Sequence, residues 1–136
     1  IEDRIILGGD SYRYFNMYKD KYIKWFPADK ITHIINVSNE SLQPSEIPIV
    51  SETPIIYEDY PITESETDAE KVKIPLYKAA ARINEILTEN PNNTVYLHCS
   101  LGVNRSPATL ILYYMKYRNM TLYDAYRAGL GPSVCV

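Results

Sequence analysis

Four short runs of apolar, mostly β-branched residues constrain the fold of this chain more than any other feature. They lie at 4–7, 32–37, 54–57 and 94–98. Runs of this length and composition are typical of strands that are buried on both faces of a sheet. Polar and proline-bearing residues separate the second run from the third, so we expect the chain to make a surface excursion there.

Apolar residues at three- and four-residue spacing predict a long helix between the third and fourth runs. They form one stripe from Val72 to Leu87, and this spacing places them on one face of a helix. Thr67 and Glu70 stand at the spacing of a capping box ahead of the helix. Pro75 is expected either in the first turn or at a kink, because proline cannot donate a helical hydrogen bond.

Three further segments are predicted to be helical. One runs from about 106 to 117, and another follows Thr121 and ends at Gly129, with Asp124 at the capping-box position. The aromatic-rich segment 10–25 is expected to be helical in part. Strands that alternate with helices imply an α/β fold with a largely parallel sheet.

Length, charge and cysteine content restrict the class of protein. The 136 residues are one domain's worth of sequence, so we predict a single domain over 1–136. The net charge of −3 argues against general attraction to nucleic acid or to a membrane surface, and no apolar stretch is long enough to span a bilayer. Two cysteines do not make a disulfide framework, so we expect a reducing intracellular compartment, cytoplasmic or nuclear. The oligomeric state stays open.

The segment from His98 to Pro107 carries a pattern that points to chemistry. It follows the fourth apolar run and opens a predicted helix, with Cys99 at one end of a loop and Arg105 at the other. Backbone N–H groups of such a loop can form a nest for a tetrahedral dianion, and the helix N-terminus adds its positive dipole end. The same field lowers the pKa of a thiol, so we expect Cys99 to be a thiolate near neutral pH. Arg105 offers a fork that matches two phosphate oxygens.

Other residues of the loop are predicted to support this chemistry. Gly102 lets the backbone approach an anion without a Cβ clash. Ser106 is placed to donate a hydrogen bond toward the cysteine sulfur, and His98 is expected to order the loop backbone and not to act as a base. The predicted substrate-binding residues are Ser100, Leu101, Gly102, Val103, Asn104 and Arg105.

The residues His98-Cys99, Gly102 and Arg105-Ser106 together resemble the signature of the cysteine-dependent protein tyrosine phosphatases. The short chain and the strand-like residues 30–37 are similar to the dual-specificity branch, and residues 102–106 are similar to its poxvirus-type members. The resemblance implies a phosphatase-like fold with three α/β/α layers and a central, mostly parallel sheet of about five strands.

The resemblance covers about residues 1–129 of the chain. Residues 131–136 do not resemble the closing helix of the family, so we allow for a domain that lacks this helix.

The resemblance also implies a two-step hydrolysis without a metal or other cofactor. The Cys99 thiolate would form a phosphocysteine, while Arg105 holds the phosphate oxygens. A carboxylic acid would protonate the leaving oxygen and then act as a base on water. Alignment from the strand side selects Glu64, which we prefer. Alignment from the helix side selects Glu66. Asp68 is the nearest aspartate downstream, and Asp59 is the nearest upstream.

The variable residues of the loop favour a phosphorylated protein as the substrate. None of them is basic, whereas family members that act on inositol lipids or RNA ends tend to carry extra lysine or arginine there. By analogy, the short chain suggests a shallow pocket that admits phosphoserine and phosphothreonine as well as phosphotyrosine.

Two alternatives come from other classes of function. The first is a phosphatase-like module that binds phosphopeptides with little turnover. The second is a sulfur-transfer or arsenate-reducing enzyme, which is disfavoured because the loop lies late in the chain and Cys135 is the only other thiol.

Overall fold

A parallel sheet forms the centre of the protein, seen in a computed structural model that describes residues 4–50, 53–63, 65–100 and 104–129. Within these residues the main sheet has four strands, in the order β1–β6–β2–β5. Their bounds are Ile5–Gly8 for β1, His33–Asn36 for β2, Ile56–Asp59 for β5 and Val95–His98 for β6. All three pairings are parallel, and β6 pairs with β1 on one side and β2 on the other. The predicted parallel α/β fold is confirmed, with four strands in place of about five.

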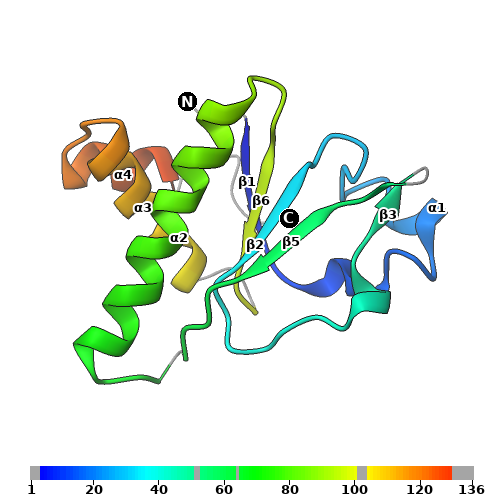
Figure 1. Cartoon of the computed structure of the whole chain (residues 1–136), viewed down its shortest axis with the longest axis horizontal. Helices are drawn as coiled ribbons and strands as arrows, with labels where there is room; N and C mark the ends of the chain where they lie inside the picture. The colour runs from blue at the N-terminus through cyan, green and yellow to red at the C-terminus, as the bar shows by residue number, and fades with distance from the viewer. Residues whose placement is uncertain (1–3, 51–52, 64, 101–103, 130–136) are drawn as a thin grey trace.

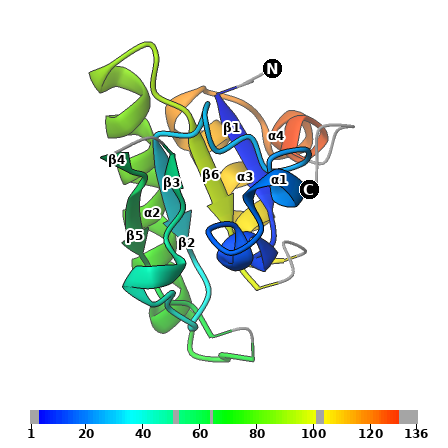
Figure 2. The ribbon, with the colours of Figure 1, turned by 90° about the vertical axis from the view of Figure 1, so that its right-hand side faces the viewer.

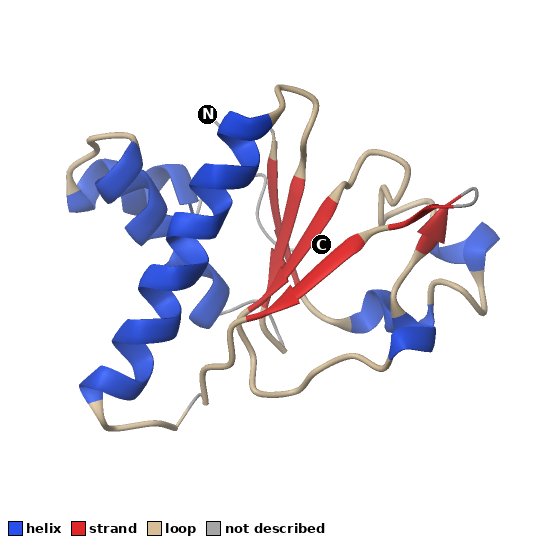
Figure 3. Cartoon of the chain, viewed as in Figure 1, coloured by secondary structure: helices blue, strands red, loops and turns tan. Residues whose placement is uncertain are grey.

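Helices of very different length cover the two faces of this sheet (Figure 1). The long helices lie together on one face, and the short ones lie on the opposite side with a small antiparallel hairpin (Figures 1 and 2). The first group is α2 (Ala69–Glu89), α3 (Arg105–Tyr117) and α4 (Leu122–Gly129). The second group is η1 (Ser11–Tyr14), α1 (Lys19–Tyr22), η2 (Pro44–Glu46), β3 (Ile49–Val50) and β4 (Thr53–Pro54). Figure 3 shows the strands between these two groups.

Alternating residues of the strands supply two separate apolar cores. On β2, Ile35 packs toward the long helices and Ile34 packs toward the short ones. On β6, Leu97 and Tyr96 divide in the same way. Because side chains alternate along a strand, continuous apolar runs are what a sheet covered on both faces requires.

Large aromatic side chains fill the core beneath the short helices. Tyr12 stacks on Phe26 with ring centroids 4.9 Å apart, and Tyr96 meets Phe26 edge-on at the same centroid distance. Aromatic side chains bury roughly 150–250 Å² each. A cluster of them therefore covers this face without a long helix.

One local prediction for α2 was wrong, and one of the two positions allowed for Pro75 is excluded. Its N-cap is Asp68, not Thr67, and the Asp68 carboxylate accepts the backbone N–H of Glu70 at 3.0 Å. Pro75 lies inside the helix beyond the first turn, so the carbonyl of Lys71 has no N–H donor four residues later. The same helix is fastened to the edge strand β5 by Arg82, whose Nε lies 2.9 Å from Oε1 of Glu58.

The apolar run at 54–57 divides between two sheets. Pro54 is the last residue of β4 and pairs with Ile49 of β3, and β5 begins only at Ile56. The predicted surface excursion before this run is partly buried, since Val37 is fully enclosed and Leu42 is 6% exposed. Among the helices that the structure describes, none has the length and apolar character needed to cross a lipid bilayer.

Candidate active site

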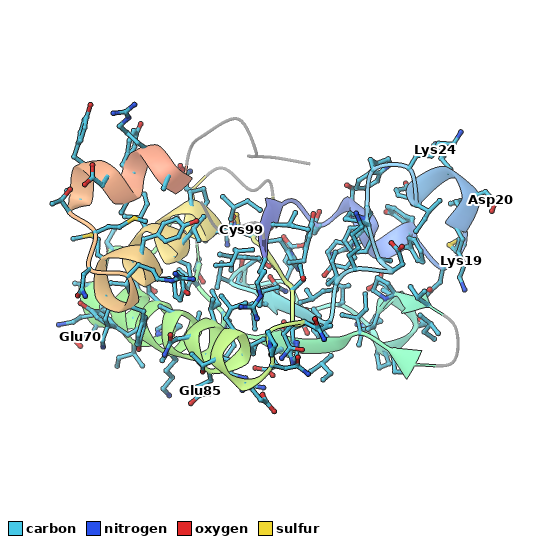
Figure 4. All side chains as sticks on the ribbon, turned by 90° about the horizontal axis from the view of Figure 1, so that it is seen from above. Lys19, Asp20, Lys24, Glu70, Glu85 and Cys99 are labelled. Atoms are coloured by element: carbon cyan, nitrogen blue, oxygen red, sulfur yellow. The ribbon has the colours of Figure 1, made fainter. Side chains whose placement is uncertain are left out.

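Cys99 lies where β6, one of the two inner strands of the sheet, ends. All four residues of β6 are buried, and Cys99, the next residue, is 2% exposed. The strands run parallel, so the segments that follow β1, β2 and β5 gather at the same edge of the sheet as Cys99. Figure 4 shows Cys99 in the middle of the molecule, whereas the labelled charged side chains lie at its periphery.

The hydroxyl of Ser106 faces the sulfur of Cys99. The two atoms, Ser106 Oγ and Cys99 Sγ, are 3.4 Å apart, and Ser106 is fully buried in the first turn of α3. A hydroxyl can donate to a thiolate, and the N-terminal end of a helix favours negative charge. The structure therefore brings together a thiol, a hydroxyl and the positive end of a helix.

His98 links the cysteine loop to η1 through hydrogen bonds at both ring nitrogens. Its Nδ1 lies 2.9 Å from the carbonyl oxygen of Cys99, and its Nε2 lies 2.7 Å from the hydroxyl oxygen of Tyr12. Because a carbonyl can only accept, Nδ1 carries the proton and Nε2 accepts from Tyr12. Burial lowers the pKa of His98 to about 4, so the ring is neutral at pH 7.

Tyr12 is a supporting residue that the sequence did not reveal. It is fully buried, and burial raises the pKa of its hydroxyl, so the hydroxyl keeps the proton that it donates to His98. The sequence is rich in tyrosine, but packing alone accounts for this, so no single tyrosine stands out as part of a site. No spacing rule connects two residues that lie 86 positions apart.

Arg105 is held by two loops that the sequence analysis did not select. Its Nη1 donates to the carbonyl of Ile62 at 2.7 Å and to Oδ1 of Asn39 at 3.3 Å. Its buried Nε has no hydrogen-bond partner among the described residues. The guanidinium is thus held through Nη1, while its Nε–H group has no acceptor among the described residues.

A buried asparagine shapes the turn that presents Asn39. The side chain of Asn36 donates to the carbonyl of Glu40 at 2.8 Å and accepts the backbone N–H of Ser38 at the same distance. Asn36 also donates to Oδ1 of Asp59 at 3.1 Å. These bonds join the ends of β2 and β5 next to Arg105.

The candidate acids have different surroundings. Oε2 of Glu66 accepts the backbone N–H groups of Thr67 and Asp68 at 3.1 and 3.0 Å, and Asp68 caps α2. Asp59 accepts hydrogen bonds from Tyr57 and other neighbours. Glu64 lies outside the described residues.

The substrate-binding residues predicted on the loop are described only in part. The carbonyl of Ser100 accepts the backbone N–H of Asp10 at 3.3 Å, and Asn104 is the N-cap of α3. Leu101, Gly102 and Val103 lie outside the described residues. Within the described ranges, no group of three or more His, Cys, Asp and Glu residues is arranged to hold a metal ion.

Comparison with known families identifies the class of protein. The catalytic domain of the dual specificity phosphatases matches residues 14–128, which is most of the chain. The chain therefore belongs to the dual specificity phosphatase catalytic-domain family. The resemblance to this branch of the cysteine-dependent phosphatases is confirmed.

Individual relatives agree with this assignment. Mouse dual specificity protein phosphatase 18 is 31% identical over 106 residues, which cover 73% of this chain and 47% of the relative. Mouse dual specificity protein phosphatase 13B is 30% identical over 96 residues, which cover 70% of this chain and 47% of the relative. The chain thus spans about half the length of these relatives. The crystal structure of human DUSP28 matches 94% of this chain and 75% of its own, with a TM-score of 0.64 and 16% identity, and shows the same fold.

Proposed function

We propose that this domain hydrolyses phosphate monoesters on phosphorylated proteins through a phosphocysteine intermediate. The observation that carries the proposal is the position of Cys99 Sγ, 3.4 Å from Ser106 Oγ at the start of α3. A buried structural cysteine has no need of this hydroxyl or of a helix N-terminus. A nucleophilic thiolate and an anionic substrate benefit from both.

The first step forms the phosphocysteine. The Cys99 sulfur attacks phosphorus, the bond from phosphorus to the leaving oxygen breaks, and that oxygen takes a proton from a carboxylic acid. In the second step, water attacks phosphorus after losing its proton to the same carboxylate, and the phosphorus–sulfur bond breaks. Arg105 holds the phosphate oxygens through both steps, and Ser106 stabilises the departing thiolate.

His98 is given a positioning role in this mechanism. At neutral pH its ring is uncharged and both nitrogens are occupied by hydrogen bonds to Cys99 and Tyr12. A ring so engaged does not exchange protons with a substrate. It fixes the backbone at the nucleophile instead.

We assign the general acid to Glu64. The carboxylate of Glu66 is engaged by two backbone N–H groups, and that of Asp68 caps a helix. Both carboxylates are thus engaged by the backbone at the start of α2, where they satisfy N–H groups that a helix end leaves unpaired. Glu64 follows soon after Ile62, whose carbonyl is bound by Arg105.

The proposed substrates are phosphotyrosine and phosphoserine or phosphothreonine in proteins. The matched family and both mouse relatives carry dual specificity in their names. The loop residues that vary within the signature add no positive charge for an inositol phosphate or a nucleic acid.

The test is hydrolysis of an aryl phosphate and of phosphopeptides by the wild-type domain and by Cys99→Ser. We expect Cys99→Ser to abolish phosphate release, and acid quenching of the wild type to trap phosphate on Cys99. Glu64→Gln should slow hydrolysis of a poor leaving group far more than that of a good one, and Glu66→Gln is the matched control. Tight binding of phosphopeptides without any release of phosphate would instead support the binding-module alternative.

A further inference from the structure

We infer that Arg13 is a second anion-binding residue at the rim of the active site, which selects phosphoresidues flanked by another anionic group. The inference rests on the proposed function, because it names a class of substrate for the same site.

Arg13 belongs to the segment that packs against the cysteine loop. It lies in η1, which follows β1, and the parallel pairing of β1 with β6 puts the end of β1 at the same edge of the sheet as Cys99. Figure 2 shows β1 beside β6. One residue before it, Tyr12 bonds to His98, and three residues before it the backbone N–H of Asp10 donates to the carbonyl of Ser100. The N–H of Arg13 itself bonds to the carbonyl of Asp10. These contacts place the backbone of Arg13 directly beside the loop.

The electrostatic neighbourhood agrees with this placement. Burial is the main cause that lowers the pKa of His98, and the positive charge of Arg13 contributes in the same direction. Arg13 is therefore close enough to His98 for its charge to act on the imidazole ring.

Arg13 and Arg105 share an unusual feature. Among the buried side-chain nitrogen and oxygen atoms of the described residues, only Nε of Arg13 and Nε of Arg105 have no hydrogen-bond partner. Native proteins rarely leave buried donors unpaired, and functional sites are a common place for the exceptions. Arg105 is the arginine of the phosphatase signature, so the second exception marks Arg13 as a candidate for the same kind of ligand.

The guanidinium of Arg13 also has unused donors that solvent reaches. Its side chain is 23% exposed, and its one ion pair is a 3.4 Å contact between Nη2 and Oδ2 of Asp10. Burial raises the pKa of Asp10, and the nearby charge of Arg13 opposes this shift. A guanidinium carries more donors than one long contact uses, and its fork matches a carboxylate or a phosphate.

The experiment compares phosphotyrosyl peptides that differ only beside the phosphotyrosine. One peptide has neutral flanks, one has glutamate flanks and one has a second phosphoresidue. We expect kcat/KM of the wild type to be about fivefold higher for at least one anionic peptide than for the neutral peptide. Arg13→Gln should reduce this ratio to about one, and Arg13→Lys should restore part of it. Lys19→Gln, which removes a charge from the exposed helix α1, should leave the ratio unchanged.

Each outcome of this comparison either supports or overturns the role of Arg13. A preference for only one of the two anionic peptides identifies the carboxylate or the phosphate as the ligand, and a preference for neither overturns the inference. A ratio that survives Arg13→Gln overturns it as well. An equal loss for neutral and anionic peptides would mean that Arg13 has only a structural role. If the wild type releases no phosphate from any substrate, the proposed function fails, and Kd values of the same peptides for Cys99→Ser still test the preference.

Discussion

Replacement of Tyr12 by phenylalanine tests the hydrogen bonds that support the backbone at Cys99. The change removes one oxygen and keeps the ring that stacks on Phe26 at 4.9 Å. It leaves Nε2 of His98, which accepts from the hydroxyl at 2.7 Å, without its donor. Both residues are fully buried, so water cannot replace the lost bond without rearrangement of the core.

The expected loss of stability follows from the burial of this acceptor. Leaving a buried polar group unsatisfied costs about 1–3 kcal/mol. Unfolding entropy is about 2.1 cal/mol/K per residue, which is about 0.3 kcal/mol/K for a domain of this length. Tyr12→Phe should therefore lower the melting temperature by about 3–10 °C.

Urea unfolding and calorimetry measure this difference, and the matched control lies in the same short helix. Tyr14 is 47% exposed, so Tyr14→Phe should change the free energy of unfolding by less than about 0.5 kcal/mol. Nitrogen NMR of the His98 ring reports the tautomer directly, and we expect the proton on Nδ1. A Tyr12→Phe variant as stable as the wild type, or a proton on Nε2, would show that Tyr12 does not donate this hydrogen bond to His98.

Three further predictions concern the same strands and loop. Gly8→Ala should destabilise the fold by about 1–3 kcal/mol in urea titration, because the added Cβ would lie 2.0 Å from the hydroxyl oxygen of Tyr96. Ser106→Ala should slow breakdown of the phosphocysteine about tenfold or more in rapid-quench kinetics, with Ser106→Thr restoring part of the rate, because the thiolate of Cys99 loses a charge-assisted hydrogen bond. Burial lowers the pKa of His98 from 6.5 to about 4, so the unfolded chain binds a proton in this window that the folded chain does not. The free energy of unfolding should keep its full value above the pKa of the unfolded chain. Between pH 7 and pH 5 it should fall by about 2 kcal/mol more in the wild type than in His98→Gln. Urea titration at both pH values measures this difference.

The parts of the fold that the sequence predicts are those decided by local patterns. Continuous apolar runs identified the four strands of the main sheet, and three- and four-residue spacing identified α2. The capping pattern at Asp124 and the end at Gly129 identified α4. The cap of α2 was assigned to the wrong residue because Thr67 and Asp68 can both accept a backbone N–H. The choice between them depends on the backbone conformation at the start of the helix, where Glu66 accepts the N–H groups of both residues. Asp68 takes the extended backbone conformation of a cap and bonds to Glu70.

The candidate site divides in the same way. The thiol, the hydroxyl and the arginine stand close together in the sequence, because they lie between the end of β6 and the first turn of α3. The residues that hold these groups in place lie far from them in the sequence. Tyr12 lies 86 residues from His98, and Asn39 and Ile62 lie 66 and 43 residues from Arg105.

The strand order brings these supports together, and it is a property of the whole chain. Since β6 lies between β1 and β2, the segments after β1 and β2 must flank the loop that follows β6. The first segment supplies Tyr12, Asp10 and Arg13, and the second supplies Asn39. An apolar run reveals that a segment is a strand, but it carries no information about which strand will be its neighbour. For this reason Arg105 is recognisable in the signature itself, whereas Arg13 can be placed beside the same loop only when the order of the sheet is known.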